Sequence, residues 1–262
     1  EWDRMQAINK GVEPIGECRG DLDIQLELGK RLNPEAWPWS SVEDIYDEFL
    51  VSMGMTFKKL KEKGPVYPGF EYRKYEKGLL RPDGKPGFKT PTGKLELYAT
   101  IFDQAGQDPL PDYKEPPESP VSTPELMEAY PLVLTTGART PVRFHSEHRQ
   151  YGTGLREIQP DPIVEVHPDT ADGLGIKDGD WVIIESRHGK CRQRAKLTPI
   201  IGPRVVSAQH SWWFPEKPME EPSLGGVWES NINLLFPPDL RSKTGLGYPF
   251  KSWICKIYKE EQ

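Results

Sequence analysis

The sequence predicts an α+β protein that is mainly β with small helices. Three observations lead to this class. The second half of the chain contains short apolar or alternating segments of strand length, separated by glycine-bearing turns. The first half contains brief helical periodicities that end at glycine or proline. Between the halves lies a proline-rich stretch with few apolar residues. We therefore expect two regions, 1–122 and 123–262.

Helical signals come first along the chain. Asp21 is placed to cap a helix that carries Leu22, Leu26 and Leu32. The pattern Ser40-Ser41-Val42-Glu43 is a capping box, and the apolar residues that follow fall on one helical face. A third, shorter helix around Phe57 and Leu60 ends at Gly64. Helices this short gain most of their stability from packing, so we expect them to need a partner surface.

Residues 87–94, Gly-Phe-Lys-Thr-Pro-Thr-Gly-Lys, predict a turn, and the alternation at Leu95 and Leu97 predicts a strand after it. A linker follows between Pro109 and Pro124, where prolines alternate with acidic residues. Proline fixes φ and removes a hydrogen-bond donor, so such a segment runs extended and separates packed regions. We place the boundary near residue 122.

The second region predicts mainly strands. Arg187-His188-Gly189-Lys190 is placed to turn one strand back on its neighbour, and a short helix over 170–174 should end at Gly175. A closed or partly closed barrel would remove the exposed strand edges. The expected strands are 132–136, 163–167, 181–186, 191–198, 204–208 and 254–258.

Composition excludes several classes of protein. The 262 residues carry a net charge of -6, which argues against a general nucleic-acid binder, and the apolar runs are far too short to span a membrane. Cys18, Cys191 and Cys255 show no metal-ligand spacing and predict no zinc or iron–sulfur site. Because the chain begins at Glu1 without a leader pattern, we expect a fragment or a processed product.

The loop from Thr135 to Arg149 is dense in hydroxyl, arginine and histidine side chains. A buried strand stops at its start, so backbone N–H groups are released beside Arg139, which favours an anion site. A solvated surface loop is the alternative. His145 and His148 lie three residues apart, but no further ligands accompany them, so we predict no metal site.

Asn231 and Asn233 are expected on one side of an extended segment, where amides could read the edge of a heterocycle. Turn capping is the alternative for these two residues. The cluster His210-Ser211-Trp212-Trp213-Phe214 fits a core or a domain interface, or the wall of a ligand site. No phosphate-binding loop and no nucleophile arrangement is present, so we predict no catalytic residue.

Several motifs occur in a distinctive order. They are Gly-Phe-x-Thr-Pro-x-Gly-Lys-x-Glu at 87–96, Thr-Thr-Gly-x-Arg at 135–139 with His145-Ser146, His-Pro-Asp-x-Ala at 167–171 with Leu-Gly-Ile-x-Asp-Gly-Asp at 174–180, and Asn231-x-Asn233. In this order the chain resembles the C-terminal region of molybdopterin oxidoreductases of the dimethyl sulfoxide reductase family. The resemblance implies a double-psi β-barrel over 123–262, preceded over 1–122 by part of a mixed α/β catalytic portion.

The resemblance also implies a cofactor. Relatives hold molybdenum or tungsten on two molybdopterin guanine dinucleotides, with the metal ligand and any iron–sulfur site in upstream parts of the protein. By resemblance, the residues that line the cofactor here are Thr135, Thr136, Gly137, Arg139, His145, Ser146, Asn231 and Asn233, with Lys251 a weaker candidate. The fragment need not retain the cofactor by itself.

The implied function is to bind and orient the pterin dinucleotide while the metal performs redox chemistry. We expect the chain alone to be inactive and its partners to be upstream domains of the same protein and an iron–sulfur electron-transfer subunit. Two alternatives are a stand-alone barrel that serves as a binding module and a small non-catalytic subunit that docks on a metal-bearing chain. The sequence does not indicate a substrate or a compartment.

Overall fold

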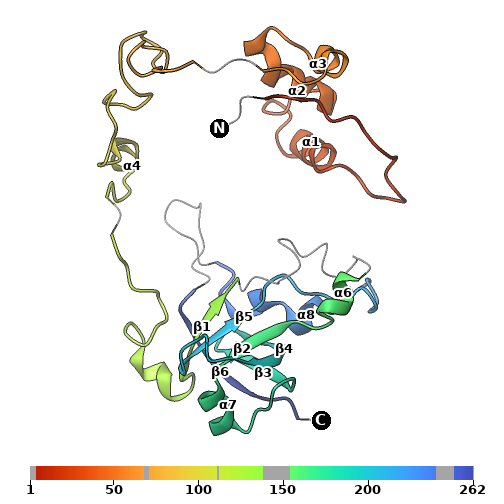
Figure 1. Cartoon of the computed structure of the whole chain (residues 1–262), viewed down its shortest axis with the longest axis vertical. Coiled ribbons are helices and arrows are strands. Elements are labelled where there is room, and N and C mark those ends of the chain that lie inside the picture. The colour runs from red at the N-terminus through yellow and green to blue at the C-terminus, as the bar shows by residue number, and fades with distance from the viewer. Residues whose placement is uncertain (1–3, 68–70, 111, 138–153, 240–250, 262) are drawn as a thin grey trace. The chain divides into compact units, whose positions relative to one another are not determined.

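The structure is a computed structural model that describes residues 4–67, 71–110, 112–137, 154–239 and 251–261. The chain divides into two compact units, Glu1–Glu96 and Leu97–Gln262. The first is built from short helices, and the second contains a β-barrel (Figure 1). Our boundary near residue 122 remains a prediction about domains.

The first unit contains the three predicted helices. They are α1 (Asp21–Leu32), α2 (Val42–Leu50), which continues into the 3-10 helix η1 (Val51–Met53), and α3 (Phe57–Lys63). The N-cap of α1 is Gly20 and not Asp21. The capping box at α2 pairs Ser41 with Asp44, one position later than expected. Gly64 ends α3 with a positive φ of 77°, as its sequence position predicted.

Residues 71–96 form compact turns. Phe88 N–H donates to Gly93 O, and the Arg81 guanidinium lies against Gly93 so closely that a Cβ there would be 1.7 Å from Arg81 Nη1. The strand expected at 95–97 is absent from this described segment. Local hydrogen bonds explain why the prediction was wrong: Thr92 donates to the Glu96 carboxylate, and no strand pairs with this segment.

The second unit begins with α4 (Thr100–Gln104) and the linker, which ends in the 3-10 helix η2 (Pro124–Glu128). The linker is not uniformly solvated, because Glu118 and Ser119 are buried. Ser119 Oγ accepts hydrogen bonds from the backbone N–H groups of Val121 and Ser122. Linker residues around 118 are therefore folded together with the barrel.

The six strands lie close to where the sequence predicted them. They are β1 (Leu132–Thr136), β2 (Ile163–Val166), β3 (Trp181–Ser186), β4 (Gly189–Leu197), β5 (Val205–Ala208) and β6 (Trp253–Lys259). They close into a barrel in the order β1-β5-β2-β4-β3-β6. β1 pairs in parallel with β5, β2 pairs in parallel with β4, and the remaining pairs are antiparallel. The closed barrel confirms the predicted fold class.

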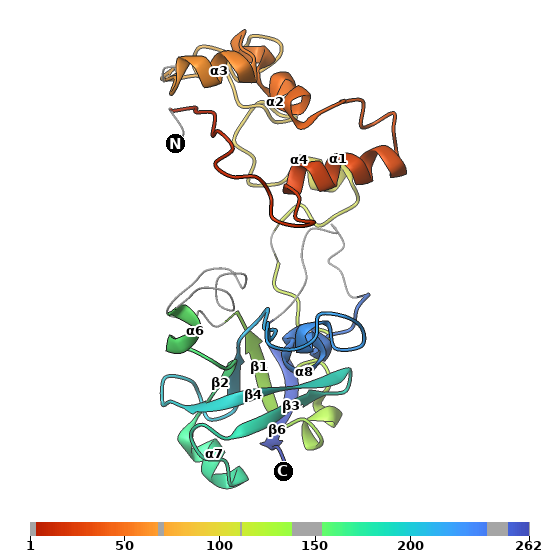
Figure 2. The same cartoon turned by 90° about the vertical axis from the view of Figure 1, so that its right-hand side faces the viewer.

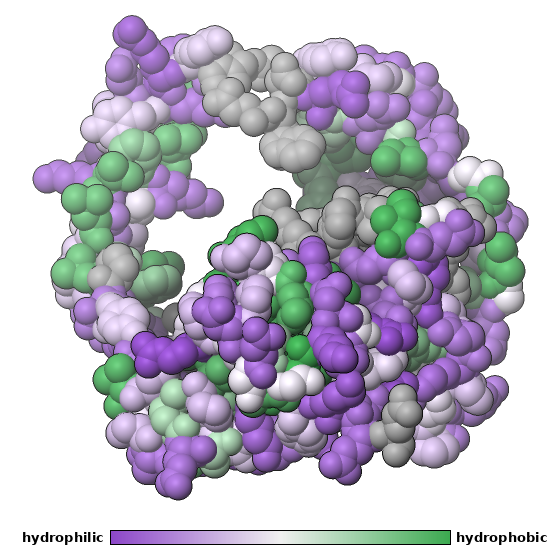
Figure 3. Space-filling view, turned by 60° about the horizontal axis from the view of Figure 1, so that its bottom comes forward, coloured by the Kyte–Doolittle hydropathy of each residue, from purple (hydrophilic) through white to green (hydrophobic). Residues whose placement is uncertain are grey.

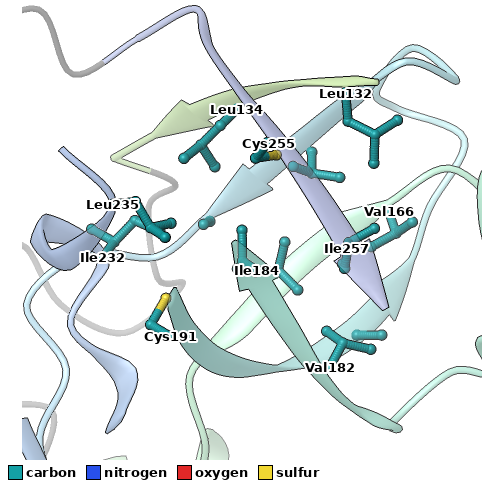
Figure 4. Packing of buried hydrophobic residues seen from close by; sticks show 14 of the residues in the cluster. Leu132, Leu134, Val166, Val182, Ile184, Cys191, Ile232, Leu235, Cys255 and Ile257 are labelled. Carbon is teal, nitrogen blue, oxygen red and sulfur yellow. The ribbon is translucent and has the colours of Figure 1, made fainter. Parts of the chain in front are cut away.

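The barrel interior is an apolar core. Alternate residues of the strands point inward, and Leu134, Val166, Val182 and Ile184 are fully buried (Figure 4). The 3-10 helix η4 (Ile232–Leu235) adds its two end residues to the same cluster, beside Cys191. Burial of this apolar surface is the main source of the barrel's stability.

Short helices lie at the two ends of the barrel. α7 (Pro168–Leu174) follows β2 and ends at Gly175 in the left-handed conformation, as predicted. α6 (Leu155–Ile158) and α8 (Val227–Ser230), with the 3-10 helix η3 (Leu224–Gly226) before it, lie at the end opposite α7 (Figure 2). β1, β3 and β5 finish at this second end, which we call the Thr136 end.

Hydrophilic residues cover most of the face seen in Figure 3, with hydrophobic residues scattered among them. Within the described part of the chain, none of the helices combines the length and the apolar character that a membrane crossing requires.

Candidate functional site

The Thr136 end of the barrel gathers segments that are far apart in the sequence. β1 and β5 are parallel, with Thr136 paired to Ala208, so both strands finish here. β6 is antiparallel to β1, with Leu134 paired to Trp253, so β6 begins here. The turn between β3 and β4 also lies at this end. Backbone groups at the ends of these strands need hydrogen-bond partners outside the ladder, and a polar ligand is one source of such partners.

The first predicted site residues lie where β1 finishes. Thr136 is buried, Thr135 is half-buried, and Gly137 is exposed with φ of 82°. Among the described residues, its chain neighbours aside, no atom lies within 4 Å of the position that a Cβ of Gly137 would take. The chain therefore leaves the strand in a conformation that favours glycine, with open space beside its backbone. Arg139, His145 and Ser146 follow in the sequence but lie outside the described residues.

Lys251 lies near the same strand end. It precedes the start of β6 by two residues, and β6 begins with Trp253 paired to Leu134 of β1. Its side chain is exposed, and the neighbouring Ser252 has a positive φ of 66°. Thr136, the last residue of β1, and Lys251, two residues before the adjacent strand β6, thus belong to the same end of the barrel although they are 115 positions apart in the sequence.

Asn231 and Asn233 lie in a different structure from the one we expected. Only Asn231 has extended backbone, and it joins α8 to η4, so the prediction that both residues lie on one extended segment was wrong. Asn231 Oδ1 accepts a hydrogen bond of 3.0 Å from Asn233 N, which makes Asn231 the N-cap of η4, while Asn233 is exposed. The turn-capping alternative therefore describes Asn231 in this structure.

Helix η4 is nevertheless held beside the Thr136 end. Ser186, at the end of β3, donates from its hydroxyl to Leu235 O at 2.8 Å. Gly189 begins β4 so close to η4 that a Cβ would lie 2.4 Å from Leu234 O. Asn231 and Asn233 are thus carried by a helix packed against the β3–β4 turn.

A buried amide network fixes the segment that follows β5. Gln193 and Gln209 are fully buried. The Gln193 amide donates to Gln209 O at 2.8 Å and accepts from Gln209 N at 3.2 Å. Gln209 Oε1 in turn accepts from Gln159 Nε2 and from Ile163 N. Sequence reasoning missed this network, because its members are spread over three segments.

Two buried donors near this segment lack acceptors. Trp212 is 1% exposed, and its indole N–H finds no acceptor among the described residues. Arg156 Nη1 is likewise buried without a partner, although Nη2 donates to Glu216 at 2.6 Å. The Arg156 guanidinium lies 5.8 Å from the Trp212 ring centre. An acceptor-rich, negatively charged ligand suits such donors, because an unpaired buried donor is costly.

Metal-ligand chemistry is not evident in the described segments, where no group of three or more His, Cys, Asp and Glu side chains is placed to hold an ion. Cys191 and Cys255 lie in the barrel core. Burial raises the pKa of Cys191 to about 12 and also raises the pKa of Cys255, so both thiols stay protonated at neutral pH. A protonated, buried thiol is a packing residue and a poor metal ligand.

The chain is similar to proteins of known families. Residues 132–254 match the family described as "Molydopterin dinucleotide binding domain". The chain is 38% identical to a dopamine dehydroxylase of Eggerthella lenta, over 97% of this chain and 31% of that protein. It is 33% identical to an acetylene hydratase of Syntrophotalea acetylenica, over 79% of this chain and 27% of that protein.

A solved structure is also similar. Acetylene hydratase from Pelobacter acetylenicus superposes with a TM-score of 0.74 at 28% identity, over 98% of this chain and 35% of that chain. The chain therefore spans about a third of the length of these relatives. The family match covers the barrel from the start of β1 to the start of β6.

Proposed function

The chain belongs to the molybdopterin oxidoreductases of the dimethyl sulfoxide reductase family, and on that premise we propose that its barrel binds and orients a molybdopterin guanine dinucleotide at the Thr136 end. The observation that carries the proposal is a pair of buried donors, Trp212 Nε1 and Arg156 Nη1, that find no acceptor among the described residues. A dinucleotide supplies pyrophosphate and heterocycle acceptors for donors of this kind.

Residues of this chain would perform three tasks. The released backbone around Gly137 and the hydroxyls of Thr135 and Thr136 would bind polar edges of the dinucleotide. Lys251 would offer a positive charge from the adjacent strand. The buried Gln193–Gln209 network would keep the segment after β5 in place, so that the site is formed before the ligand arrives.

The remaining predicted contacts belong to the same proposal. Arg139, His145 and Ser146 would extend the site from the segment that follows Gly137. Asn231 and Asn233 would approach from the turn that carries them. When bound, the cofactor supplies a molybdenum or tungsten centre that exchanges electrons with substrate. The protein's contribution is to bind, orient and bury that group.

We further propose that this chain is part of a longer enzyme and is inactive alone. A redox centre needs a protein ligand to its metal and a route for electrons. Upstream domains would supply the first, and an iron–sulfur subunit would supply the second. The extent of the relatives supports this view, since each is between three and four times as long as the matched region.

Titration calorimetry with GDP tests the proposal, because GDP reproduces the guanine and pyrophosphate of the cofactor. We expect GDP to bind, and Lys251→Ala to weaken binding roughly three- to tenfold, as for one partly exposed charged contact. Lys196→Ala is the control, because Lys196 is also a partly exposed lysine but lies on β4 and faces Glu165 of β2. Absence of any GDP binding would oppose the proposal and favour a barrel that recognises another class of ligand.

A further inference from the structure

Glu118 is a linker residue whose side chain is buried against the turn between β3 and β4. It is 3% exposed, whereas the linker around it is largely exposed. Its Oε1 accepts from Arg187 Nε at 2.8 Å and lies 2.7 Å from Arg187 Nη2. His188 Nε2 donates to the same oxygen at 2.7 Å. One carboxylate oxygen of Glu118 thus contacts the side chains of Arg187 and His188, which are the two residues of the turn.

The position of this carboxylate is costly and therefore informative. Removing a carboxylate from water is unfavourable unless charge and hydrogen bonds compensate it. Here the second oxygen, Oε2, is buried and has no hydrogen-bond partner among the described residues. An acid that only kept the linker soluble would lie in water. The free-energy cost of burying Glu118 must therefore be offset by its contacts with the β3–β4 turn, which hold that turn in place.

Two paths lead from the turn to the segments of the proposed cofactor site. His188 N donates to Ser186 Oγ at 3.1 Å, and that hydroxyl donates to Leu235 O, the last residue of η4. The His188 ring also packs edge-on against Trp253, at 5.9 Å between ring centres. Trp253 begins β6 two residues after Lys251 and packs edge-on against Phe236, directly after η4.

We propose that Glu118 is a positioning residue that fixes the β3–β4 turn and, through His188, orders both η4 and the start of β6. Asn231 is the N-cap of η4, Asn233 lies within η4, and Lys251 lies two residues before β6. The linker thereby sets the geometry of two segments that flank the Thr136 end. The link to the cofactor rests on the proposed function, whereas the ordering itself concerns only this chain.

Hydrogen exchange measured by mass spectrometry on the whole chain tests the ordering. We expect Glu118→Gln to speed exchange in peptides over 186–190, 231–236 and 251–255 by roughly tenfold or more, since a charged hydrogen bond is lost. Exchange over the strands β2 and β5 should stay as in the unsubstituted chain. Glu125→Gln is the matched control: it is the same change seven residues further on, at an exposed position, and it should alter none of these peptides.

A double-mutant cycle with His188→Phe tests the route through His188. This substitution keeps an aromatic ring against Trp253 and the backbone N–H of residue 188, but it removes the ring Nε2–H that donates to Glu118. The effect of Glu118→Gln on 231–236 should largely disappear in that background. If the effects of Glu118→Gln and His188→Phe on exchange are fully additive, Glu118 does not act on η4 through His188. If exchange speeds up only in linker residues 112–123, Glu118 does not position the turn at all. GDP affinity should also fall in Glu118→Gln. If the unsubstituted chain binds no GDP, the proposed function fails while the exchange data still decide this inference.

Discussion

The two units of the chain bury apolar residues to different extents. The barrel contains many residues at 0% exposure, among them Leu134, Val166 and Ile184. The buried cluster of the first unit consists of Leu50, Leu60 and Val66, at 3–7% exposure. Large apolar side chains such as Phe49 remain mostly exposed in that unit. The barrel thus has a large and fully buried core, whereas the first unit has only a small one.

Closure of the sheet into a barrel explains why the second unit buries its apolar residues more completely than the first. A closed barrel satisfies its backbone hydrogen bonds within the sheet and surrounds its core on all sides. Helices of seven to twelve residues, such as α1, α2 and α3, are too short to be stable without packing and bury only one face each. A unit made of such helices leaves apolar surface exposed when it is considered by itself.

Thiol reactivity should separate the two units most sharply. Cys18 of the first unit is exposed, whereas Cys191 and Cys255 lie in the barrel core. Burial raises the pKa of Cys191 from 9.0 to about 12, so at pH 8 its thiolate fraction is about a thousandfold below that of a thiol with the usual pKa. With Ellman's reagent, we expect one thiol to react quickly and two only after denaturation.

Cys18→Ser provides the control for this experiment, because it should remove the fast phase and leave the slow one. Equal reaction rates for all thiols of the native chain would mean that the barrel core opens readily and is no better protected from the reagent than the first unit. Raising the pH toward 12 should increase the thiolate fraction of Cys191, although its burial continues to limit access of the reagent.

Truncation of one leucine in each unit should have unequal effects. Leu134→Ala removes a fully buried side chain, and we expect a loss of about 2–5 kcal/mol in the free energy of unfolding of the barrel. Leu32→Ala makes the same change at a side chain that is 76% exposed, and we expect less than about 0.5 kcal/mol. Urea unfolding followed by circular dichroism measures both. A similar loss for the two variants would contradict the contrast in packing.

Two glycines test how rigid the packing is. A Cβ at Gly189 would lie 2.4 Å from the backbone oxygen of Leu234, whereas a Cβ at Gly29 would meet the side chain of Trp37. A backbone carbonyl held by η4 cannot move away, so Gly189→Ala should destabilise the barrel by about 1–3 kcal/mol. A Cβ at Gly29 would lie 2.1 Å from Trp37 Cδ2, but this contact is with a side chain and alanine favours the helix, so Gly29→Ala should cost less than Gly189→Ala. Thermal unfolding of both variants gives the comparison, and a larger cost at Gly29 would refute it.

Local sequence patterns were sufficient to predict most of the fold. The strands carry alternating or continuous apolar residues, and the helix ends at Gly64 and Gly175 follow from the positive φ that glycine adopts easily. Residues 95–97 show the limit of this reasoning. Alternation indicated a strand, but a strand also needs a partner, which depends on the rest of the fold.

The site was less predictable for the same physical reason. Ile232 and Leu235 are three residues apart and enter the barrel core, which is a helical signal that the Asn231 and Asn233 interpretation overlooked. Glu118 appeared to be one more solvated acid of a proline-rich linker. Its burial depends on Arg187 and His188, some seventy residues further along the chain, and nothing near Glu118 in the sequence indicates them.

A cross-strand contact on the outside of the barrel should give the smallest effect. Glu185 of β3 accepts a hydrogen bond of 2.7 Å from the Tyr258 hydroxyl and pairs with Lys256 Nζ at 2.9 Å, both on β6. The Tyr258 hydrogen bond, followed by the Lys256 contact, lowers the pKa of Glu185 below its usual 4.5. Because the folded-state pKa is lowered, the contact stabilises the barrel fully above about pH 4.5, and this stability is lost as the pH falls through the lowered pKa.

Glu185→Gln should therefore reduce the free energy of unfolding by less than about 1 kcal/mol near neutral pH, since the Glu185 side chain is 25% exposed. Urea midpoints measured from pH 3 to pH 6 should fall less steeply toward low pH in this variant than in the unsubstituted chain. Glu128→Gln removes one negative charge at an exposed position and controls for net charge. If Glu185→Gln and the unsubstituted chain lose stability in parallel as the pH falls, the outer contacts between β3 and β6 contribute nothing, and the barrel's advantage over the first unit lies in its core and its closure alone.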